Sequence, residues 1–403
     1  MNRTTLNPLL GALGIILLII APFWLGDSPY LMHIAISAFF YAILASSWSL
    51  LAGYAGQFSF GHMAFMAIGA YTAALFSYYV KFTTAPTHEC TEFSLGNIWL
   101  VILNPIGVSN LGGNCLEVAK QTMPTGTIII QPPLWAGLLI GTVVGGLFGL
   151  GIGLLVLRLR STYLALFTIG FSEILRAALS AELDITQGQS GFEMDPLFPN
   201  GLNILGYAFG PADKIPPYYV MLLLFLVCMG IMAWLTSSRF GLFIRAIRED
   251  EEAAAALGVH VIRYKVLVFS ITSMMAAAAG IIQGHYIGII TPNILVILQM
   301  SLVIAMAVIG GLESIVAAAI GALVIQTLLE LLRNSFEIGP FEVNMTIWRL
   351  VWFGAVLMLT LRFQRNGLIY PIINWITRGN VAQETVSKRQ VTDDLQTPGT
   401  EAA

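Results

Sequence analysis

Few residues in this chain could do chemistry, because charged side chains are scarce and most lie beside long apolar stretches. Glu173 and Arg176 stand out: both fall inside the apolar stretch 161–181, three residues apart, so on a helix they share a face and can form an ion pair. Charges inside such a stretch are energetically costly and by default mark a functional site. The alternative is a neutralised pair near the end of the segment, where long side chains reach the water interface.

A second polar cluster lies in residues 53–62 (GYAGQFSFGH), between two apolar stretches. Glycines interrupt the apolar pattern there, and Gln57, Ser59 and His62 supply polar groups. Irregular backbone near a membrane is tolerated only where protein or water covers it, and transporters use broken helices of this kind beside polar pathways. The cluster is therefore either a broken helix or a short turn before the next helix. For His62, as for the isolated His285, a structural role is favoured over a proton relay.

The cysteines fall in two environments. Cys228 lies in the middle of an apolar stretch, where a free thiol behaves as a small buried apolar residue. Cys90 and Cys115 lie in the polar stretch 81–133, which the charge pattern below assigns to the oxidising side of the membrane. They can form a disulfide or remain two free thiols. Their spacing resembles no zinc or iron–sulfur site, so we expect no metal.

The sequence argues against two enzymatic sites. Residues 188–191 read G-x-S-G, as an intramembrane serine protease would need, but Ser190 precedes Phe-Glu-Met-Asp-Pro, which cannot begin the helix that such a site requires. A tight glycine turn is the better interpretation. A phosphate-binding P-loop requires Gly-Lys, and no lysine in the chain follows a glycine. We therefore expect no catalytic residues and no bound cofactor, with any ATP hydrolysis located in another protein.

The stretch 237–265 has the pattern of an amphipathic helix of about 240–258. Ser238, or the serine before it, can begin the helix, and Gly258 can end it. One face is apolar at the spacing i, i+3, i+4, i+7, through Phe240, Phe243, Ile244 and Ile247.

The other face of this predicted helix is charged and balanced. Arg245 with Glu249, and Arg248 with Glu252, are spaced to form i, i+4 pairs. The balance of charge argues against simple attraction to anionic lipid. The helix is either a solvated interfacial connector or a docking element for another protein.

Composition and hydropathy define the elements that position these groups. Apolar residues make up 57% of the 403 residues and charged residues only 10%, which excludes an ordinary soluble domain. Ten apolar segments can be interpreted as helices crossing the roughly 30 Å hydrocarbon layer, so we predict an all-α polytopic membrane protein with about ten transmembrane helices. The predicted spans are 7–25, 30–52, 61–80, 134–157, 161–181, 217–236, 264–290, 294–311, 312–332 and 347–361.

Charge distribution predicts the orientation. With Arg3 inside, 13 of the 19 Lys and Arg residues lie on the cytoplasmic side, five outside and one, Arg176, within a span. Both termini are then cytoplasmic, and the loops 81–133 and 182–216 are external. The membrane domain is predicted to cover 1–376, and the polar residues 377–403 are typical of a disordered cytoplasmic tail. The net charge of −3 gives no sign of nucleic-acid binding.

One span carries a packing signal. Glycines recur at every fourth position of 134–157, so they fall on one helix face. Helix association in lipid depends on close approach, which such a strip permits, and we favour this interpretation over the general tolerance of membrane helices for glycine. The glycines are Gly137, Gly141, Gly145, Gly149 and Gly153.

Residues 252–258, EAAAALG, fit the E-A-A-x-x-x-G motif by which permeases of ATP-binding-cassette importers engage their ATPases. Together with further blocks across residues 50–335, this motif resembles the LivM family of branched-chain amino-acid permeases. Two features depart from the pattern: no Leu-Pro follows Gly258, and the loop 81–133 is long. The further blocks are Gly53–Gln57 with Gly61-His62, Ile68–Ala74, Tyr163–Leu166 with Glu173–Arg176, Ser238–Gly241, Arg245–Glu249 and Gly310–Leu312.

The resemblance implies an ABC importer permease fold with a cytoplasmic coupling helix between spans six and seven. It also implies four kinds of partner: a second, LivH-like permease, two cytoplasmic ATPases that use ATP, an external substrate-binding protein and the lipid of a bacterial-type inner membrane. The ATPase-coupling residues would be Phe240, Arg245, Ile247, Arg248, Glu249, Glu252, Ala253, Ala254 and Gly258. The translocation pathway would include Gln57, Ser59, His62, Glu173 and Arg176.

The main alternative is an ion-coupled secondary transporter or channel. Such a protein should carry unpaired carboxylates near mid-membrane, whereas Glu313 and Glu330 lie at span ends. We therefore favour a permease for branched-chain or related amino acids. Other amino acids, urea and short amides are not distinguished by the sequence.

Overall fold

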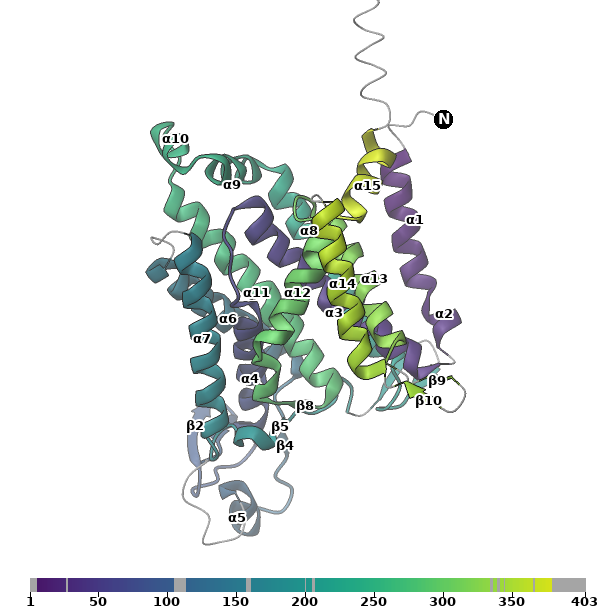
Figure 1. The fold of residues 1–403 in the computed structure, drawn as a ribbon. Coiled ribbons are helices and arrows are strands. Elements are labelled where there is room, and N and C mark those ends of the chain that lie inside the picture. Colours follow the sequence, from purple (N-terminus) through teal and green to yellow (C-terminus); the bar gives the residue numbers. More distant parts are fainter. Residues whose placement is uncertain are drawn as a thin grey trace, which may run out of the picture.

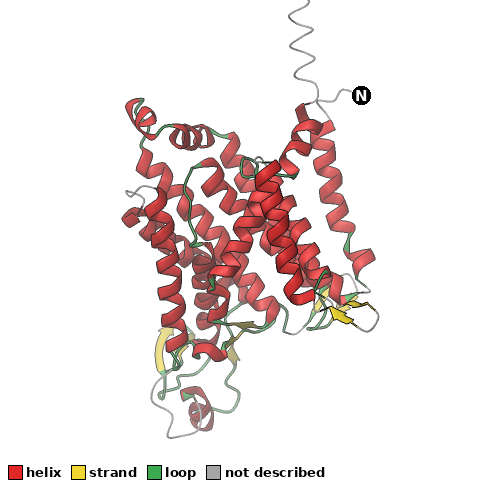
Figure 2. Cartoon of the chain, in the orientation of Figure 1, coloured by secondary structure: helices red, strands yellow, loops and turns green. Residues whose placement is uncertain are grey.

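The computed structural model describes residues 6–26, 28–104, 114–156, 161–199, 201–204, 207–333, 336–338, 341–343, 345–364 and 367–378. Helices dominate this part of the chain, and its short strands gather at one end (Figure 2). The strands are an addition to the predicted all-α fold. Of the predicted tail, residues from 379 onward lie outside the described residues.

Three helices form the centre of the bundle: α3 (Pro29–Ser49), α4 (His62–Tyr79) and α11 (Val261–Ile287). In the most apolar 18-residue stretch of α3 and of α11, 89% and 83% of the residues are buried, against 17% in α7 (Ser161–Ala181). Helices of similar composition therefore occupy opposite environments, α3 and α11 inside the protein and α7 at its periphery, where apolar side chains face outward.

Helix α6 (Leu134–Val156) packs on α4 and α11 through its glycines, as predicted. A Cβ atom at Gly141 would stand 2.6 Å from the carbonyl oxygen of Gly69 in α4, and one at Gly149 would stand 2.5 Å from a side chain of α11. Gly151, outside the strip, has nothing within 4 Å of the same atom. The absence of side chains on one face therefore sets how closely these three helices approach.

Each predicted span overlaps a helix or a pair of helices, and five described helices are long and apolar enough to cross a membrane: α3, α6, α7, α8 and α11. Helices α12 and α13 are bent by 119° where they meet, so together they form either one broken span or a re-entrant loop. The number of ten spans stays a prediction. The other helices of the bundle are α1 (Leu6–Ile20), α2 (Pro22–Leu25), α8 (Ile215–Ser237), α12 (Ile297–Gly310), α13 (Ile315–Leu331) and α14 (Met345–Phe363).

The predicted external loop 81–133 folds into a small sheet and a helix. An antiparallel sheet has the strand order β2-β3-β1-β4, and a disulfide from Cys90 to Cys115 (S–S 2.09 Å, Cα–Cα 5.4 Å) fastens the adjoining helix α5 to it. The structure thus forms the bond that the sequence left open. The elements are β1 (Val80–Thr83), β2 (Thr91–Leu95), β3 (Ile98–Ile102), β4 (Ile129–Ile130) and α5 (Cys115–Thr122).

Short strand pairs connect the remaining loops at the same end. Residues 188–191 form a turn with positive φ at Gly188 and Gly191, in agreement with the glycine turn favoured over a protease site. The elements are η3 (Gly188–Ser190), β5 (Phe192–Glu193) paired with β8 (Ile289–Ile290), β6 (Leu202–Ile204) with β7 (Tyr207–Phe209), η4 (Pro292–Leu295), and β9 (Phe336–Ile338) with β10 (Phe341–Val343).

At the opposite end lie α9 (Arg239–Glu249), α10 (Glu251–Ala256), α15 (Ile369–Arg378) and the beginning of α1 (Figure 1). The loop between α8 and α11 therefore shares one end of the molecule with the first and last described helices, and the loops 81–133 and 182–216 occupy the other. This separation is the one that the predicted topology requires.

Candidate functional site

The chain turns back into the bundle after α3. A π-helical turn, η2 (Leu50–Tyr54), ends the helix, and residues 55–61, here called the re-entrant segment, return beside it in extended form before α4 begins at His62 (Figure 1). The indole Nε1 of Trp48, on α3, donates to the carbonyl oxygen of Ser59 at 2.8 Å. The bond holds the segment antiparallel to the end of the helix that precedes it.

Further hydrogen bonds fix both sides of the re-entrant segment. The amide of Gln57 donates to the carbonyl of Leu51 at 3.0 Å, and the amide of Phe60 donates to Oγ1 of Thr168, on α7, at 2.9 Å. Ser172, one turn further along α7, donates to the Phe60 carbonyl at 3.5 Å. Non-helical backbone at this depth needs such partners because lipid offers none.

The polar side chains predicted here are buried together. Gln57, Ser59 and His62 are exposed by 3%, 0% and 1%. Ser59 Oγ accepts from the amide of Gly61 at 3.1 Å, whereas the amide group of Gln57 and both ring nitrogens of His62 have no hydrogen-bond partner. Buried polar groups are normally paired, and leaving one unpaired costs about 1–3 kcal/mol. Orphans this close together require an explanation.

The Glu173–Arg176 pair is placed elsewhere. The two side chains form an ion pair of 2.8 Å on α7 and are 41% and 32% exposed. They line neither of the cavities described for this structure. Gln57, Ser59 and His62 line neither cavity either, but they are buried, so the exposed pair and the buried polar group lie in different environments.

A cavity of about 260 Å³, here called the inner cavity, lies among α3, α4, α11, α12 and α13. That volume is near the lower end for small-molecule sites, so it suits one small solute. Its wall is apolar over Phe40, Met63 and Met66. Its polar lining residues are His33, Ser37, Tyr41, Gln283, Gln299, Gln326 and Glu330.

Some polar groups of the inner cavity form hydrogen bonds within the protein, and others can still accept one from a solute. Tyr41 donates to Oε1 of Gln299 at 3.1 Å, which fixes α3 to α12. Gln283 Oε1 is buried without a partner, and Glu330 contributes a carboxylate that also faces Arg333 at 3.6 Å. A free amide oxygen and a carboxylate can both accept hydrogen bonds from an ammonium group. The cavity can therefore hold a solute with one cationic and one apolar part.

The predicted helix 240–258 is two helices. Asp250 has extended backbone (φ −152°, ψ 111°) and ends α9, and its carboxylate accepts from the amides of Glu252 and Ala253, each at 3.0 Å, to begin α10. The prediction of one continuous helix was wrong because an aspartate in the middle can cap a new helix as readily as continue the old one. We call α9, α10 and the turn at Gly258 the tip.

The predicted ion pairs on the tip are also wrong. Arg248 donates to the carbonyl of Gly53 and, at 3.0 Å, to Oε1 of Glu313. Arg245 donates to a carbonyl at the end of α8 at 3.0 Å and lies 5.1 Å from the ring centroid of Tyr54. Both arginines contact the bundle instead of their predicted partners, and the break at residue 250 carries Glu252 away from Arg248. These contacts fix the tip to η2, the π-helical turn that precedes the re-entrant segment.

The tip has a buried and an exposed side. Ile247 and Ala254 are exposed by only 4% each, and Phe240 packs against a tyrosine ring of α11. Glu249, Glu252 and Ala253 are exposed. Ala255, Ala256 and Leu257 are exposed as well, Leu257 by 86%. Gly258 has φ +86°, which confirms its role in ending the helix. The exposed side of α10 is small, apolar and acidic.

The fold is that of a helical membrane protein, and the comparisons with known proteins make it a permease subunit of an ATP-binding-cassette importer. Residues 30–361 match the family described as "Branched-chain amino acid transport system / permease component", and the chain belongs to that family.

The relatives agree with this family assignment. The chain is 28% identical over 362 residues to the high-affinity branched-chain amino acid transport system permease protein LivM of Salmonella typhimurium, covering 83% of this chain and 72% of that one. It is 32% identical over 159 residues to LivH of Escherichia coli, covering 39% and 50%. No solved structure is significantly similar to the chain.

Sequence reasoning missed three groups that the structure brings into the site. Glu313 binds Arg248, Thr168 holds the re-entrant segment, and the inner cavity takes its polar groups from the far ends of four helices. Thr168 had a detectable signal, since it lies four residues before Ser172 on the one buried face of α7. The only signal for Glu313 was its position two residues after the glycine pair 310–311.

Proposed function

We propose that this permease carries branched-chain or related amino acids inward across a bacterial-type cytoplasmic membrane. The relatives are named for branched-chain amino acid transport. The single observation that carries the proposal is the inner cavity, which combines apolar side chains such as Met63 and Met66 with the carboxylate of Glu330. An aliphatic amino acid has a complementary apolar side chain and ammonium group.

The proposed assembly contains several partners. Relatives of two kinds, named LivM and LivH, support a second permease subunit, so that each chain forms half of the pathway. Two cytoplasmic ATPases hydrolyse ATP for both, and an external binding protein delivers the solute. The apolar periphery of α7 and α8 faces membrane lipid.

The proposed pathway runs from the inner cavity to the re-entrant segment. Met63 lines the cavity and directly follows His62 on α4, so a solute leaving the cavity meets His62 and then Gln57. In a second conformation these groups would bind the solute or water, which would explain why they lack partners in this one. The Glu173–Arg176 pair is left out of the pathway and assigned to the interface.

The tip is proposed to couple this movement to ATP hydrolysis. The exposed side of α10, with Glu252 and Ala253, would fit a groove on an ATPase. Arg248 would transmit the closure of the ATPases to the bundle. It joins α9 to the Gly53 carbonyl in η2, just before the re-entrant segment, and to Glu313, just before α13.

Uptake by the reconstituted importer tests the substrate. The two permeases, the ATPases and the binding protein encoded beside them are placed in proteoliposomes, and radiolabelled leucine is the probe. We expect ATP-dependent accumulation that excess valine inhibits and excess urea does not. Accumulation that ignores excess valine but is abolished by urea would contradict the proposed substrate class.

Variants of the tip test the coupling. Nothing lies within 4 Å of a Cβ built on Gly258, so Gly258→Trp acts through its positive φ and through the bulk it presents to a partner, not through crowding within this chain. Glu252→Lys reverses one exposed charge. Both should lower leucine uptake and ATPase co-purification about tenfold or more, while Ser237→Ala, at the end of α8, changes neither. Full uptake and full ATPase binding in both variants would make the tip a mere connector.

Cysteine labelling tests the orientation, in which both termini and the tip are cytoplasmic. The native cysteines do not interfere, since Cys90 and Cys115 form a disulfide and Cys228 is buried. A membrane-impermeant thiol reagent added outside should label Gln189→Cys and spare Ser238→Cys. The reverse pattern would invert the protein in the membrane.

A further inference from the structure

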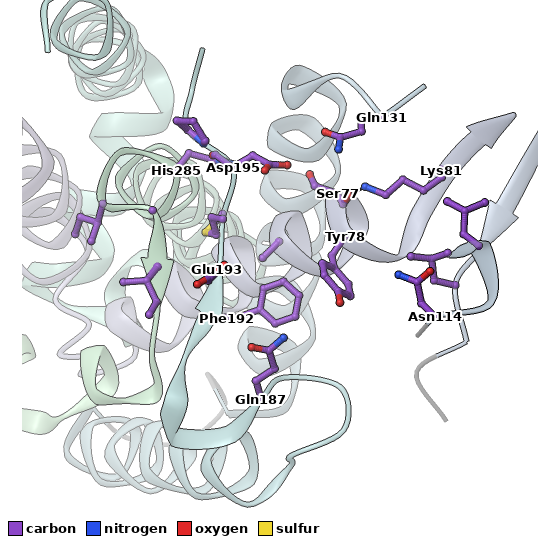
Figure 3. A pocket seen from close by; sticks show the side chains of 18 of the residues that line it. Ser77, Tyr78, Lys81, Asn114, Gln131, Gln187, Phe192, Glu193, Asp195 and His285 are labelled. Atoms are coloured by element: carbon purple, nitrogen blue, oxygen red, sulfur yellow. Dashed lines mark hydrogen bonds between the residues drawn. The ribbon is translucent and has the colours of Figure 1, made fainter. Parts of the chain in front are cut away.

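A second, larger cavity lies at the end of the molecule that carries the disulfide-closed loop. This outer chamber has a volume of about 710 Å³ and lies between the end of α4, helix α5, strand β5 and the end of α11 (Figure 3). Neither the family match nor the named relatives assign a role to it. Its size leaves room for an amino acid with several waters.

Opposite charges face each other across the outer chamber. Lys81 lies on β1, and its Nζ, which donates to the carbonyl oxygen of Ser77 at 2.8 Å, points toward Asp195 (Figure 3). Burial lowers the pKa of Lys81 from its ordinary value, and the nearby carboxylate of Asp195 opposes that shift. Among the described residues the two groups form no ion pair within 4.0 Å, so both retain capacity for a ligand.

Rigid elements hold both charges in place. Lys81 lies on β1, which pairs with β3 in the sheet beside the disulfide. Asp195 follows β5, where the amide of Met194 donates to the Gly288 carbonyl at 2.9 Å and His285 Nδ1 donates to the Asp195 carbonyl at 2.7 Å. Neither bond uses the Asp195 carboxylate. A charge pair on fixed backbone is preorganised for a ligand that carries both charges.

The outer chamber and the inner cavity share a wall. Ile287 and Ile289 line both, and they are 54% and 40% exposed. These side chains give the outer chamber an apolar surface next to Asp195. They also place any ligand of the chamber one residue layer from the inner cavity.

We infer that the outer chamber is a first binding site for a free aliphatic amino acid, with Lys81 binding the carboxylate, Asp195 the ammonium group, and Ile287 and Ile289 the side chain. A purely anionic solute would face Asp195 and Glu193, and a purely cationic one would face Lys81. The chamber therefore selects for the zwitterion. The inference rests on the proposed function and adds a second station to the pathway.

Protection of an introduced cysteine tests the site without relying on transport. Gln131 is exposed and lines the chamber together with Lys81 (Figure 3). In the purified complex, Gln131→Cys should react with a polar thiol reagent, and leucine should slow the reaction. N-acetylleucine and isopentylamine, which each lack one charge, should protect at about tenfold higher concentration. Thr125→Cys, exposed but outside the chamber, is the control that leucine should not protect.

Substitutions of the charges complete the test. In the Gln131→Cys background, Lys81→Gln and Asp195→Asn should each raise the leucine concentration needed for protection about tenfold. Lys120 and Glu117, on α5, also line the chamber but are exposed. Lys120→Gln and Glu117→Gln make the same charge changes and should alter the leucine concentration needed for protection less than about twofold, because solvent screens these groups. Unchanged melting temperatures would show that all four variants fold.

The outcomes separate this inference from the proposed function. If wild-type complex takes up leucine but leucine does not protect Gln131→Cys, the chamber is no binding site and the proposed function stands. If the Lys81 and Lys120 variants raise the leucine concentration needed for protection equally, the chamber is only a nonspecific charged surface and the inference is wrong. Absence of ATP-dependent leucine uptake by wild-type complex would instead overturn the proposed function.

Discussion

Two buried regions of the bundle differ in their chemistry. Where α6 meets α4 and α11, glycine faces bring the backbones of three regular helices into contact. Where the re-entrant segment lies between α3 and α7, the backbone is irregular and borrows bonds from Trp48 and Thr168. Gln57 and His62 are nevertheless left without partners in the same region.

The difference separates a region built for stability from one built for movement. Close-packed glycine faces have one good arrangement, and any added volume must displace a helix. An unpaired buried polar group raises the free energy of this conformation. Any other conformation in which the group finds a hydrogen-bond partner is favoured by that amount. We therefore expect substitutions in the first region to reduce stability and those in the second to reduce transport.

The largest effect is expected at Gly141, where a Cβ would stand 2.6 Å from a backbone oxygen of α4. Backbone cannot give way as a flexible side chain can, so Gly141→Leu should destabilise the protein by about 3 kcal/mol or more. Gly151→Leu adds the same side chain to the same helix in open space and should change stability by less than about 0.5 kcal/mol. Melting temperatures in detergent compare them. Equal losses would mean that the strip does not set the packing.

Arg248 joins the tip to the irregular region and should produce the next largest effect. Arg248→Gln removes charge-assisted bonds to Gly53 and Glu313, which we expect to cost about 1–2 kcal/mol because the side chain is partly exposed. Uptake should fall about tenfold while ATPase co-purification persists. Arg263→Gln, exposed at the beginning of α11, is the matched control. Normal uptake in Arg248→Gln would remove this contact from the coupling route.

A smaller effect is expected at Thr168. Thr168→Val keeps the shape of the side chain but leaves the amide of Phe60 without its acceptor, at a cost of about 1 kcal/mol. Thr72→Val is the control, because Thr72 bonds only within its own helix, at 2.6 Å to Ile68. A melting temperature as high as that of the control would show that the segment does not depend on α7.

The sequence predicted the features that depend on composition and period. The helical class, the positions of the apolar helices, the glycine strip and the turn at Gly258 all follow from residue types at regular spacing. The sequence did not predict side-chain partners that lie far apart in the chain. The Arg248 pair is the example: Glu252 lies one turn away, but the capping of α10 by Asp250 turns it aside, and Glu313 takes its place.

The cavities could not have been predicted from periodicity. The inner cavity gathers His33, Gln299 and Glu330 from the ends of three helices, and each looks like an ordinary interfacial residue in sequence. Which helix ends meet is set by tertiary packing, including the 119° bend between α12 and α13. The polar residues 57–62 were found because glycines next to them broke the apolar pattern.

The smallest effect on stability, and the sharpest test of the comparison, is expected at Gln57. Gln57→Leu replaces an unpaired amide by an apolar side chain of similar size, so the melting temperature should stay the same or rise. Leucine uptake should nevertheless fall about tenfold, because the group is needed in another conformation. Phe58→Leu, at the exposed neighbouring position, should leave uptake within about twofold. A Gln57→Leu protein that is destabilised by about 1 kcal/mol or more, or that transports normally, would show that the amide is a structural group and that the two buried regions do not differ in role.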